Sequence, residues 1–357
     1  LVALGLVVLG AGPEAAAFGT IFALFPVVPA VAFFLWIDRW EPEPSRLLLG
    51  AFLWGAGVAP VASAVTSLVL DRAWSQSVGP ESSALIGTVL TAPIVEELFK
   101  GLFLFLLLWF RRREFDGLVD GIVYAGLVGI GFAFTENILY LGSAFAEDGL
   151  AGGIGLFILR CVLSPFAHPL FTAMTGIAVG IAARSRSTVA AVLLPAVGYL
   201  GAVVLHALWN GSAAALEGAF WFVYLGVMLP VLAGLITLAV INRRREQRIV
   251  ATQLPQFVAA GWIAPDEVRP LVSLTGRRGW RAAVQRRWGK EAARALDAYH
   301  TAVTELAFLR DRLARGASGN DLYAWHHELQ QSLAAARARA LGHPQAFTEA
   351  AGPARPA

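Results

Sequence analysis

Apolar runs of about 20 residues follow one another from residue 1 to residue 242, separated by short polar breaks. A helix of that length spans the ~30 Å hydrocarbon core of a bilayer. The chain is 57% hydrophobic and 15% charged, with a mean hydropathy of +0.63, as in polytopic membrane proteins. The sequence therefore predicts an all-α, polytopic transmembrane helix bundle of about eight spans, of which the first is truncated: 1–12, 15–37, 46–70, 83–110, 117–143, 152–182, 188–213 and 219–242.

Charged residues in the predicted loops indicate the orientation of the spans. Arginines near 39–46, 111–113, 184–186 and 243–245 fall on one side, whereas the other side carries mainly acidic residues and Arg72. By the positive-inside rule the arginine-rich side is cytoplasmic. We therefore expect an integral, multi-pass protein of the cell membrane whose C-terminal part lies in the cytoplasm.

Charge also divides the chain into parts. Residues 1–242 hold 10 basic and 15 acidic residues, whereas residues 243–357 hold 18 basic and 10 acidic residues. Within the second part, 290–315 and 321–341 each carry an apolar stripe at helical spacing, which predicts an antiparallel helical hairpin. We predict a membrane domain over 1–242, a basic helical cytoplasmic domain over 243–341 and a disordered tail over 342–357.

Two features of the composition limit the partners. The basic segment RRGWRAAVQRRW at 277–288 is interpreted as a solvated face of the helical domain or as a surface resting on an anionic leaflet. No motif supports nucleic-acid binding, so we expect no nucleic-acid partner. The single cysteine, Cys161, excludes an internal disulfide framework and any multi-cysteine metal site.

The run TAPIVEELFKGLFLFLLLWF at 91–110 carries three ionisable residues inside an otherwise apolar span. An ionised carboxylate at that depth costs on the order of 3 kcal/mol by insertion measurements. Helical spacing places Lys100 within reach of Glu96 at i,i+4 and of Glu97 at i,i+3. Because one lysine neutralises only one of two carboxylates, the pair is a candidate acid/base site.

Other polar residues lie at an overlapping depth in three further spans. Glu136 lies beside Asn137 in GFAFTENILY, His168 lies in SPFAHPLFTAMTG, and His206 precedes Asn210 by one helical turn in HALWN. Arg160 is interpreted as structural, pairing with Glu136 or Glu147. We expect these groups to converge with Glu96 and Glu97 on one cavity, because buried charges are too costly to accumulate without a function.

Peptide hydrolysis requires the chemistry that this set of residues offers. A buried glutamate beside a second carboxylate is a suitable general base, and histidine with asparagine is a suitable oxyanion site. In the alternative, Glu136, His168 and His206 bind zinc while another glutamate serves as the base. We favour a site without a metal and keep zinc as the alternative cofactor. The predicted spans contain no HExxH, GxSG or GxGD motif of other intramembrane proteases.

Four motifs in order on separate spans resemble the PrsW family of intramembrane proteases: EELFK at 96–100, FAFTEN at 132–137, the histidine of HPLFTAMTG at 168–176 and HALWN at 206–210. The loop DRWEPEP at 38–44 also matches that family. The resemblance covers roughly residues 20–242, and the family is similar to the prenyl-protein CAAX endopeptidases. The CAAX-type pattern has an arginine later in its first motif, where this chain has Lys100, and a histidine where this chain has Glu136.

The resemblance implies a role for each motif. Glu96 or Glu97 is the general base, Glu136 a second acid, and His168 orients the water. His206 and Asn210 bind the oxyanion, while Lys100 and Asn137 support the site. The implied activity is cleavage of a membrane protein, such as site-1 cleavage of an anti-sigma factor in signalling. Two other functions use the same buried residues: a proton-coupled transporter and a non-enzymatic membrane sensor.

Overall fold

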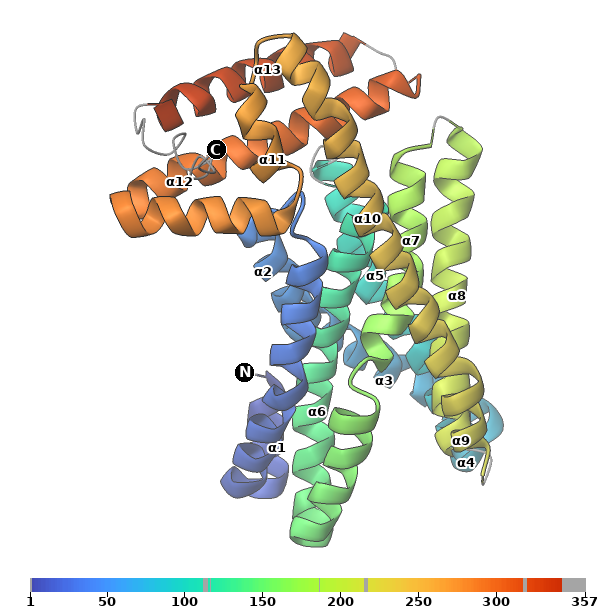
Figure 1. The fold of residues 1–357 in the computed structure, drawn as a ribbon. Helices are drawn as coiled ribbons and strands as arrows, with labels where there is room; N and C mark the ends of the chain where they lie inside the picture. Colours follow the sequence, from blue (N-terminus) through green and yellow to red (C-terminus); the bar gives the residue numbers. More distant parts are fainter. Residues whose placement is uncertain are drawn as a thin grey trace. The chain divides into compact units, whose positions relative to one another are not determined.

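The computed structural model describes residues 2–111, 115, 117–185, 187–214, 218–316 and 320–341. Every regular element among these residues is a helix, which confirms the predicted all-α class (Figure 1). The chain forms two compact units. The membrane unit comprises the described residues of Leu1–Asp38 and Glu43–Ala239, and the tail unit those of Arg39–Pro42 and Val240–Ala357. The predicted tail at 342–357 lies outside the described residues.

Within the described residues up to residue 259, ten α-helices and four π-helical turns form the membrane unit and the start of the tail unit. In chain order these are α1 (Val2–Ile37), α2 (Ser45–Leu53), η1 (Trp54–Val58), α3 (Ala59–Val78), α4 (Pro80–Ile86), η2 (Gly87–Thr91), α5 (Ala92–Phe110), α6 (Leu118–Phe157), η3 (Ile158–Leu163), α7 (Ala167–Ala183), α8 (Thr188–Ala214), α9 (Ala219–Val223), η4 (Tyr224–Met228) and α10 (Leu229–Ala259). A kink divides each of the helices α1 and α6.

Five stretches of the described chain are long and apolar enough to cross a membrane: Val7–Ile37, Ser45–Val78, Leu118–Ala183, Thr188–Ala214 and Ala219–Ala259. The polytopic helical bundle is therefore confirmed. The stretch Leu118–Ala183 covers two of the predicted spans, 117–143 except its first residue, and 152–182. The helix pair α4–α5 is absent from these five stretches, and its apolar run is interrupted by Glu96, Glu97 and Lys100.

Two glycines account for chain reversals inside long helices. Gly12 in α1 has φ 90° and Gly149 in α6 has φ 65°, a region that residues with a side chain rarely adopt. They correspond to the predicted breaks between the first and second spans and between 117–143 and 152–182. Figure 1 shows α6 running the length of the membrane unit before the chain turns back toward α7.

The predicted span 152–182 is not one helix, and this prediction is corrected. The helical chain stops at Ser164–Phe166 and begins again at Ala167. Pro165 cannot donate a backbone hydrogen bond, and the hydroxyl of Ser164 donates to the carbonyl of Leu159 at 2.7 Å. Irregular backbone at membrane depth is tolerated where it lines a cavity. This break does line one, as the site below shows.

Prolines also explain the π-helical turns. Pro60 follows η1 and removes a backbone donor from the helix. The hydroxyl of Thr135 on α6 donates to the carbonyl of Ala56 in this turn at 2.6 Å. The chain thus replaces a missing intrahelical bond with one that joins η1 to the central helix α6.

Helix α6 packs closely against α7 because small residues face each other. A Cβ atom on Gly121 would lie 2.0 Å from the carbonyl oxygen of Gly176, and one on Gly129 would lie 2.7 Å from backbone atoms of Pro169. Contacts of this kind let two backbones approach inside a membrane. The approach at Gly129 fixes the start of α7, and therefore the position of His168.

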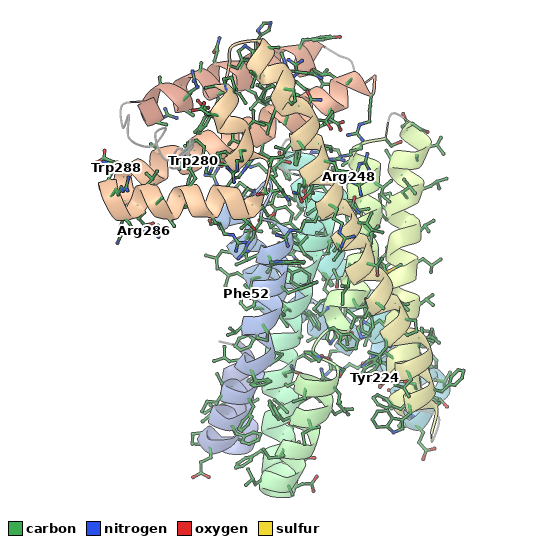
Figure 2. All side chains as sticks on the ribbon, viewed as in Figure 1. Phe52, Tyr224, Arg248, Trp280, Arg286 and Trp288 are labelled. Atoms are coloured by element: carbon green, nitrogen blue, oxygen red, sulfur yellow. The ribbon has the colours of Figure 1, made fainter. Side chains whose placement is uncertain are left out.

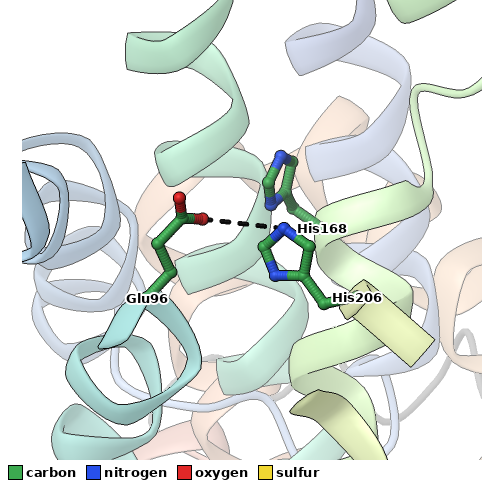
Figure 3. A group of neighbouring side chains, drawn as sticks. All are labelled: Glu96, His168 and His206. Atoms are coloured by element: carbon green, nitrogen blue, oxygen red, sulfur yellow. Dashed lines mark ion pairs between the residues drawn. The ribbon is translucent and has the colours of Figure 1, made fainter. Parts of the chain in front are cut away.

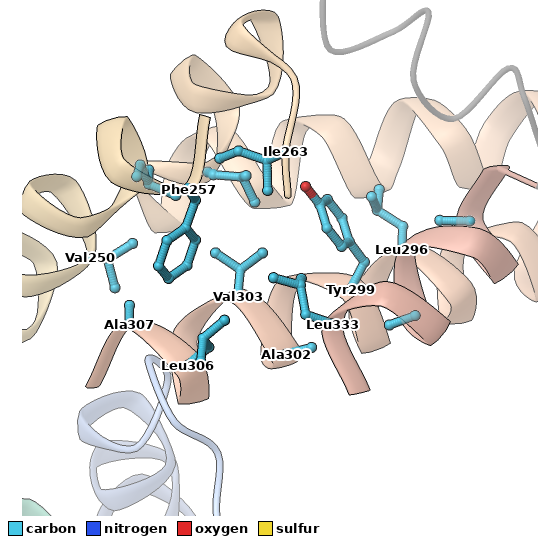
Figure 4. Close-up of a cluster of buried hydrophobic side chains, with 14 of the residues drawn as sticks. Val250, Phe257, Ile263, Leu296, Tyr299, Ala302, Val303, Leu306, Ala307 and Leu333 are labelled. Carbon is cyan, nitrogen blue, oxygen red and sulfur yellow. The ribbon is translucent and has the colours of Figure 1, made fainter. Parts of the chain in front are cut away.

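The tail unit has its own apolar core (Figure 4). Its remaining elements are η5 (Pro265–Glu267), α11 (Val268–Leu271), α12 (Leu274–Ala314) and α13 (Asn320–Leu341). Helices α12 and α13 pack together, as the predicted hairpin requires. The stripe predicted for 290–315 is buried at Leu296, Tyr299, Val303, Leu306 and Leu309. Part of the predicted turn at 316–320 lies outside the described residues.

The basic segment at 277–288 begins α12, where Figure 2 labels Trp280, Arg286 and Trp288. Trp280 and Arg277 are buried rather than solvated. Arg277 donates to the carbonyl of Leu271 at 3.0 Å and packs over the ring of Trp40, 4.9 Å from its centroid. Burial lowers the pKa of Arg277 to about 10. Part of this segment therefore belongs to the core of the tail unit.

Candidate functional site

Lys100 lies at the centre of the predicted site. Its ammonium nitrogen donates to Glu97 Oε1 at 2.8 Å and to Glu96 Oε2 at 3.2 Å, the two partners that helical spacing predicts on α5. Lys100 also packs over the ring of Phe132 on α6, 3.8 Å from the centroid. The Lys100 and Glu97 side chains are fully buried, whereas 13% of the Glu96 side chain is exposed. Of the two glutamates, Glu96 is the one that substrate can reach.

His168 joins this lysine to the α6 carboxylate. Its Nδ1 lies 3.0 Å from the nitrogen of Lys100, and its Nε2 lies 2.7 Å from Glu136 Oε2. Because a protonated lysine only donates, Nδ1 accepts and Nε2–H donates to Glu136. Both ring nitrogens of His168 are therefore engaged.

Glu136 has a second partner. Arg160 in η3 donates to Glu136 Oε2 at 2.5 Å and to Asn137 Oδ1 at 2.7 Å. The amide of Asn137 contacts the sulfur of Cys161 at 3.6 Å. Arg160 thus pairs with Glu136, one of the partners expected for a structural arginine, and Asn137 holds that arginine in place.

His206 on α8 faces both glutamates of α5. Its Nδ1 lies 3.0 Å from Glu97 Oε1, and its Nε2 lies 3.8 Å from Glu96 Oε2 (Figure 3). The ring stacks on Phe171, with centroids 4.7 Å apart. Since Glu97 accepts from Nδ1–H, the Nε2 atom is directed toward Glu96. One water with hydrogen bonds of ~2.8 Å can bridge a gap of that size.

Asn210 lies one turn beyond His206 but turns to the backbone. Its amide donates to the carbonyl of Thr88 in η2 at 3.0 Å. The π-helical turn η2 ends just before Pro93, so carbonyls of this turn lose intrahelical donors. The second N–H of the Asn210 amide is not used by this bond.

A cavity of about 840 Å³ opens onto these groups. Glu96, Glu136, His168 and Asn210 line it, together with Arg160 and Asn137. Glu97, Lys100 and His206 lie behind this wall, because the lining of the described chain does not include them. The structure thus brings all six predicted site residues and both supporting residues to one region.

The group with the geometry of a metal site differs from the predicted one. Among the described residues, Glu96, His168 and His206 offer ligand atoms within 4.8 Å of one another. The group predicted from the sequence contains Glu136 in place of Glu96. The nitrogen of Lys100 lies within 3.2 Å of two members of this group, and His168 has no uncommitted ring nitrogen.

Thr172 contacts the site but was not predicted from the sequence as a site residue. Its hydroxyl, fully buried, donates to Glu97 Oε2 at 3.0 Å. Thr172 follows His168 by four residues, and Phe132 precedes Glu136 by four. The i,i+4 spacing from His168 and from Glu136 could therefore have predicted the contacts of Thr172 and Phe132 with the site.

The comparisons with known proteins agree with these motifs. The family described as PrsW family intramembrane metalloprotease matches residues 43–235, more than half of the chain. A Protease PrsW from Oceanobacillus iheyensis is 29% identical over 232 residues, which cover 63% of this chain and 96% of that protein. A Protease PrsW from Geobacillus kaustophilus is 30% identical over 212 residues, or 58% of this chain and 84% of that protein. No solved structure matches. The chain belongs to the PrsW family of intramembrane proteases.

Proposed function

We propose that the protein hydrolyses a peptide bond of a membrane-protein substrate by means of a water activated by Glu96. The observation that carries this proposal is the contrast between the two glutamates of α5. Glu96 lines the cavity and is partly exposed, whereas Glu97 is fully buried behind it. A general base must reach the water whose proton it takes, and Glu96 alone of the pair meets that requirement.

Glu96 accepts a proton from water while the water oxygen attacks the carbonyl carbon. The carbonyl electrons move to oxygen, and the resulting oxyanion accepts hydrogen bonds from the second amide N–H of Asn210 and from protonated Nε2 of His206. Glu96 then returns its proton to the leaving nitrogen as the C–N bond breaks. The gap between Glu96 and His206 and the position of Asn210 in the cavity support these roles.

The buried groups position the reacting ones. Glu97 accepts hydrogen bonds from Nδ1 of His206 and from the nitrogen of Lys100, so it fixes the orientation of the imidazole. Glu136 and Lys100 fix the ring of His168 from both sides. The cluster holds three carboxylates and two permanent cations, Lys100 and Arg160. One further proton is therefore shared within it, as acid–base chemistry requires.

The proposed mechanism is of the glutamic type. When bound, a metal would supply a Lewis acid and an activated water, and Glu96, His168 and His206 are the residues with ligand atoms close enough to hold it. These residues do not fit that group as they are placed. An ammonium ion lies 3.2 Å from Glu96 and 3.0 Å from His168, where it repels a second cation. No step above therefore passes through a metal.

The substrate class rests on the family. An anti-sigma factor cleaved at site 1 is the candidate that the resemblance suggests, which would place the protein in signalling. The tail unit is proposed to lie in the cytoplasm, because arginines gather on that side of the spans. A C-terminal reporter that is active only in the cytoplasm tests the orientation; activity of a reporter that works only outside overturns it.

The test of the function compares two glutamate variants in cells and in proteoliposomes. Glu96→Gln should reduce cleavage by on the order of 10²–10⁴-fold, the usual contribution of a general base. Glu81→Gln, in the first turn of α4, is the matched control and should cleave normally. New N-termini of membrane proteins, mapped by mass spectrometry, identify the substrates. Unchanged cleavage by folded Glu96→Gln protein would rule out this mechanism.

A further inference from the structure

A second cavity of the membrane unit lies beside the proposed active site. This α1/α10 groove has a volume of about 370 Å³ and is lined by residues of α1, η3, α7 and α10. Apart from the thiol of Cys161, every side chain that lines it in the described chain is a hydrocarbon. Its edges face outward, since Phe25 is 59% exposed and Ile236 39% exposed. The groove is therefore open to the apolar phase.

The groove adjoins the cavity of the proposed active site. Pro26 of α1 and Pro165 of the break before α7 line both of them. Cys161 of the groove also contacts Asn137 of the cavity at 3.6 Å. An apolar segment held in the groove would thus have its next residues beside Glu96 and His168.

The backbone around the groove favours a peptide over a lipid chain. Pro26 and Pro29 lie inside α1 and each removes one backbone donor. The carbonyl of Phe25, which lines the groove four residues before Pro29, thereby loses its usual intrahelical partner. Such a carbonyl needs a donor inside a membrane, and a peptide that unwinds for cleavage supplies N–H groups. A lipid acyl chain has none to offer.

The volume also indicates how much of a peptide is held. One helical turn, 5.4 Å tall and about 10 Å across, occupies on the order of 400 Å³. The groove therefore holds about as many residues as one helical turn contains, and not a complete span.

We propose that the α1/α10 groove docks the apolar transmembrane segment of the substrate and delivers its adjoining peptide bond to Glu96. This proposal rests on the proposed function, because it assigns the entry route of that same site. It commits to a single-span apolar peptide as the occupant, with a lipid acyl chain as the competing outcome.

Cross-linking tests the docking without requiring catalysis. The background is full-length Glu96→Gln, Cys161→Ala protein in proteoliposomes. The probe is a synthetic peptide with a Lys-flanked core of about 20 Leu and Ala residues and one central cysteine. Ile236→Cys reports the groove, and Val197→Cys on α8, 66% exposed and outside both cavities of the described chain, is the control.

Disulfide formation should be at least about tenfold faster at Ile236→Cys than at Val197→Cys, as a local excess of peptide in the groove requires. Equal rates at the two positions would mean random collision in the bilayer and would overturn the proposal. Absence of a cross-link at Ile236→Cys would indicate that lipid fills the groove, which overturns it as well.

A cleavage experiment on otherwise unmodified protein separates this proposal from the proposed function. Ala30→Trp places a large side chain in the groove and should lower cleavage of an identified single-span substrate at least about tenfold. The indole would occupy the volume that the substrate segment needs. A short peptide that contains only the cleaved segment should still be cut. Leu200→Trp, on an exposed position of α8, is the matched control and should act normally.

If Ala30→Trp lowers cleavage of the single-span substrate and of the short peptide equally, the substitution has disrupted the active site itself. That result would overturn the proposed role of the groove. If unmodified protein shows no Glu96-dependent cleavage at all, the proposed function fails. In that case the cross-linking experiment still tests whether the groove docks an apolar peptide, because it does not depend on cleavage.

Discussion

The ammonium nitrogen of Lys100 lies 3.0 Å from Nδ1 of His168, although 68 positions separate the two residues in the sequence. The same nitrogen bonds both glutamates of α5. A resident cation thus occupies the centre of a group that would otherwise resemble a metal site. Lys100 therefore places a positive charge among the ligand atoms that a metal ion would need.

Removal of metal ions should leave the activity unchanged within about twofold, because Lys100 already supplies the positive charge among the ligands. The measurement is cleavage before and after dialysis against a chelator, with elemental analysis of the purified protein. A zinc metalloprotease treated in parallel should lose its activity. One zinc per chain, lost together with activity on His168→Ala, would contradict this prediction and favour the metallo-type alternative.

Thr172→Val should impair the site through Glu97. The substitution removes the hydroxyl that donates to Glu97 Oε2 without a large change in volume, and a hydrogen bond to a charged group contributes about 1.5–3 kcal/mol. We expect kcat to fall by on the order of tenfold and the pH profile of kcat to shift, because Thr172 positions Glu97 and does not touch substrate.

Thr175→Val is the matched control for this variant. Thr175 lies on the same helix and is equally buried, but its hydroxyl has no hydrogen-bond partner in the described chain. Its replacement should leave kcat unchanged and should not lower stability. Equal losses in both variants would show that the effect of Thr172→Val is one of packing.

Several features of this fold follow from sequence alone, for physical reasons. Apolar length predicts helices that cross a membrane, and mid-span charge identifies the site, because burying a charge without a function is costly. The i,i+3 and i,i+4 spacing predicts both contacts of Lys100. These features depend on local periodicity, which one sequence displays in full.

Contacts between distant helices could not be predicted in the same way. Nothing in the sequence indicates that His168 also binds Glu136, or that Asn210 turns to the carbonyl of Thr88. The order in which helices pack decides such contacts. The break at Ser164–Phe166 was missed because the run around it is apolar and a single proline is tolerated in a membrane helix.

Gly129→Ala should misplace His168. The new Cβ atom would lie 2.7 Å from the backbone of Pro169, which cannot move without shifting the start of α7. A displacement of about 1 Å at a reacting group costs on the order of 10²-fold in rate. Gly226→Ala is the control, since its Cβ meets no atom of the described chain within 4 Å. Full activity of Gly129→Ala would mean that α6 and α7 can separate without moving His168.

The tail unit should lose stability in mild acid because of His300. This histidine is buried in α12, its Nε2 has no hydrogen-bond partner in the described chain, and Arg277 and Arg281 lie near it. Burial, and then those two arginines, hold the pKa of His300 well below its usual value. The unfolded chain takes up a proton near pH 6.5, whereas the folded chain does not.

The free energy of unfolding of the tail unit therefore has its full value above about pH 6.5. Below that pH it falls by about 1.4 kcal/mol per pH unit, until the pKa of His300 in the folded chain is reached. Urea-dependent hydrogen exchange of α12 in the full chain, at pH 7.5 and pH 5.5, measures the loss. His300→Gln should remove this component, whereas His327→Gln, at an exposed position of α13, should retain it. An unchanged pH dependence in His300→Gln would show that other groups of the tail unit carry it.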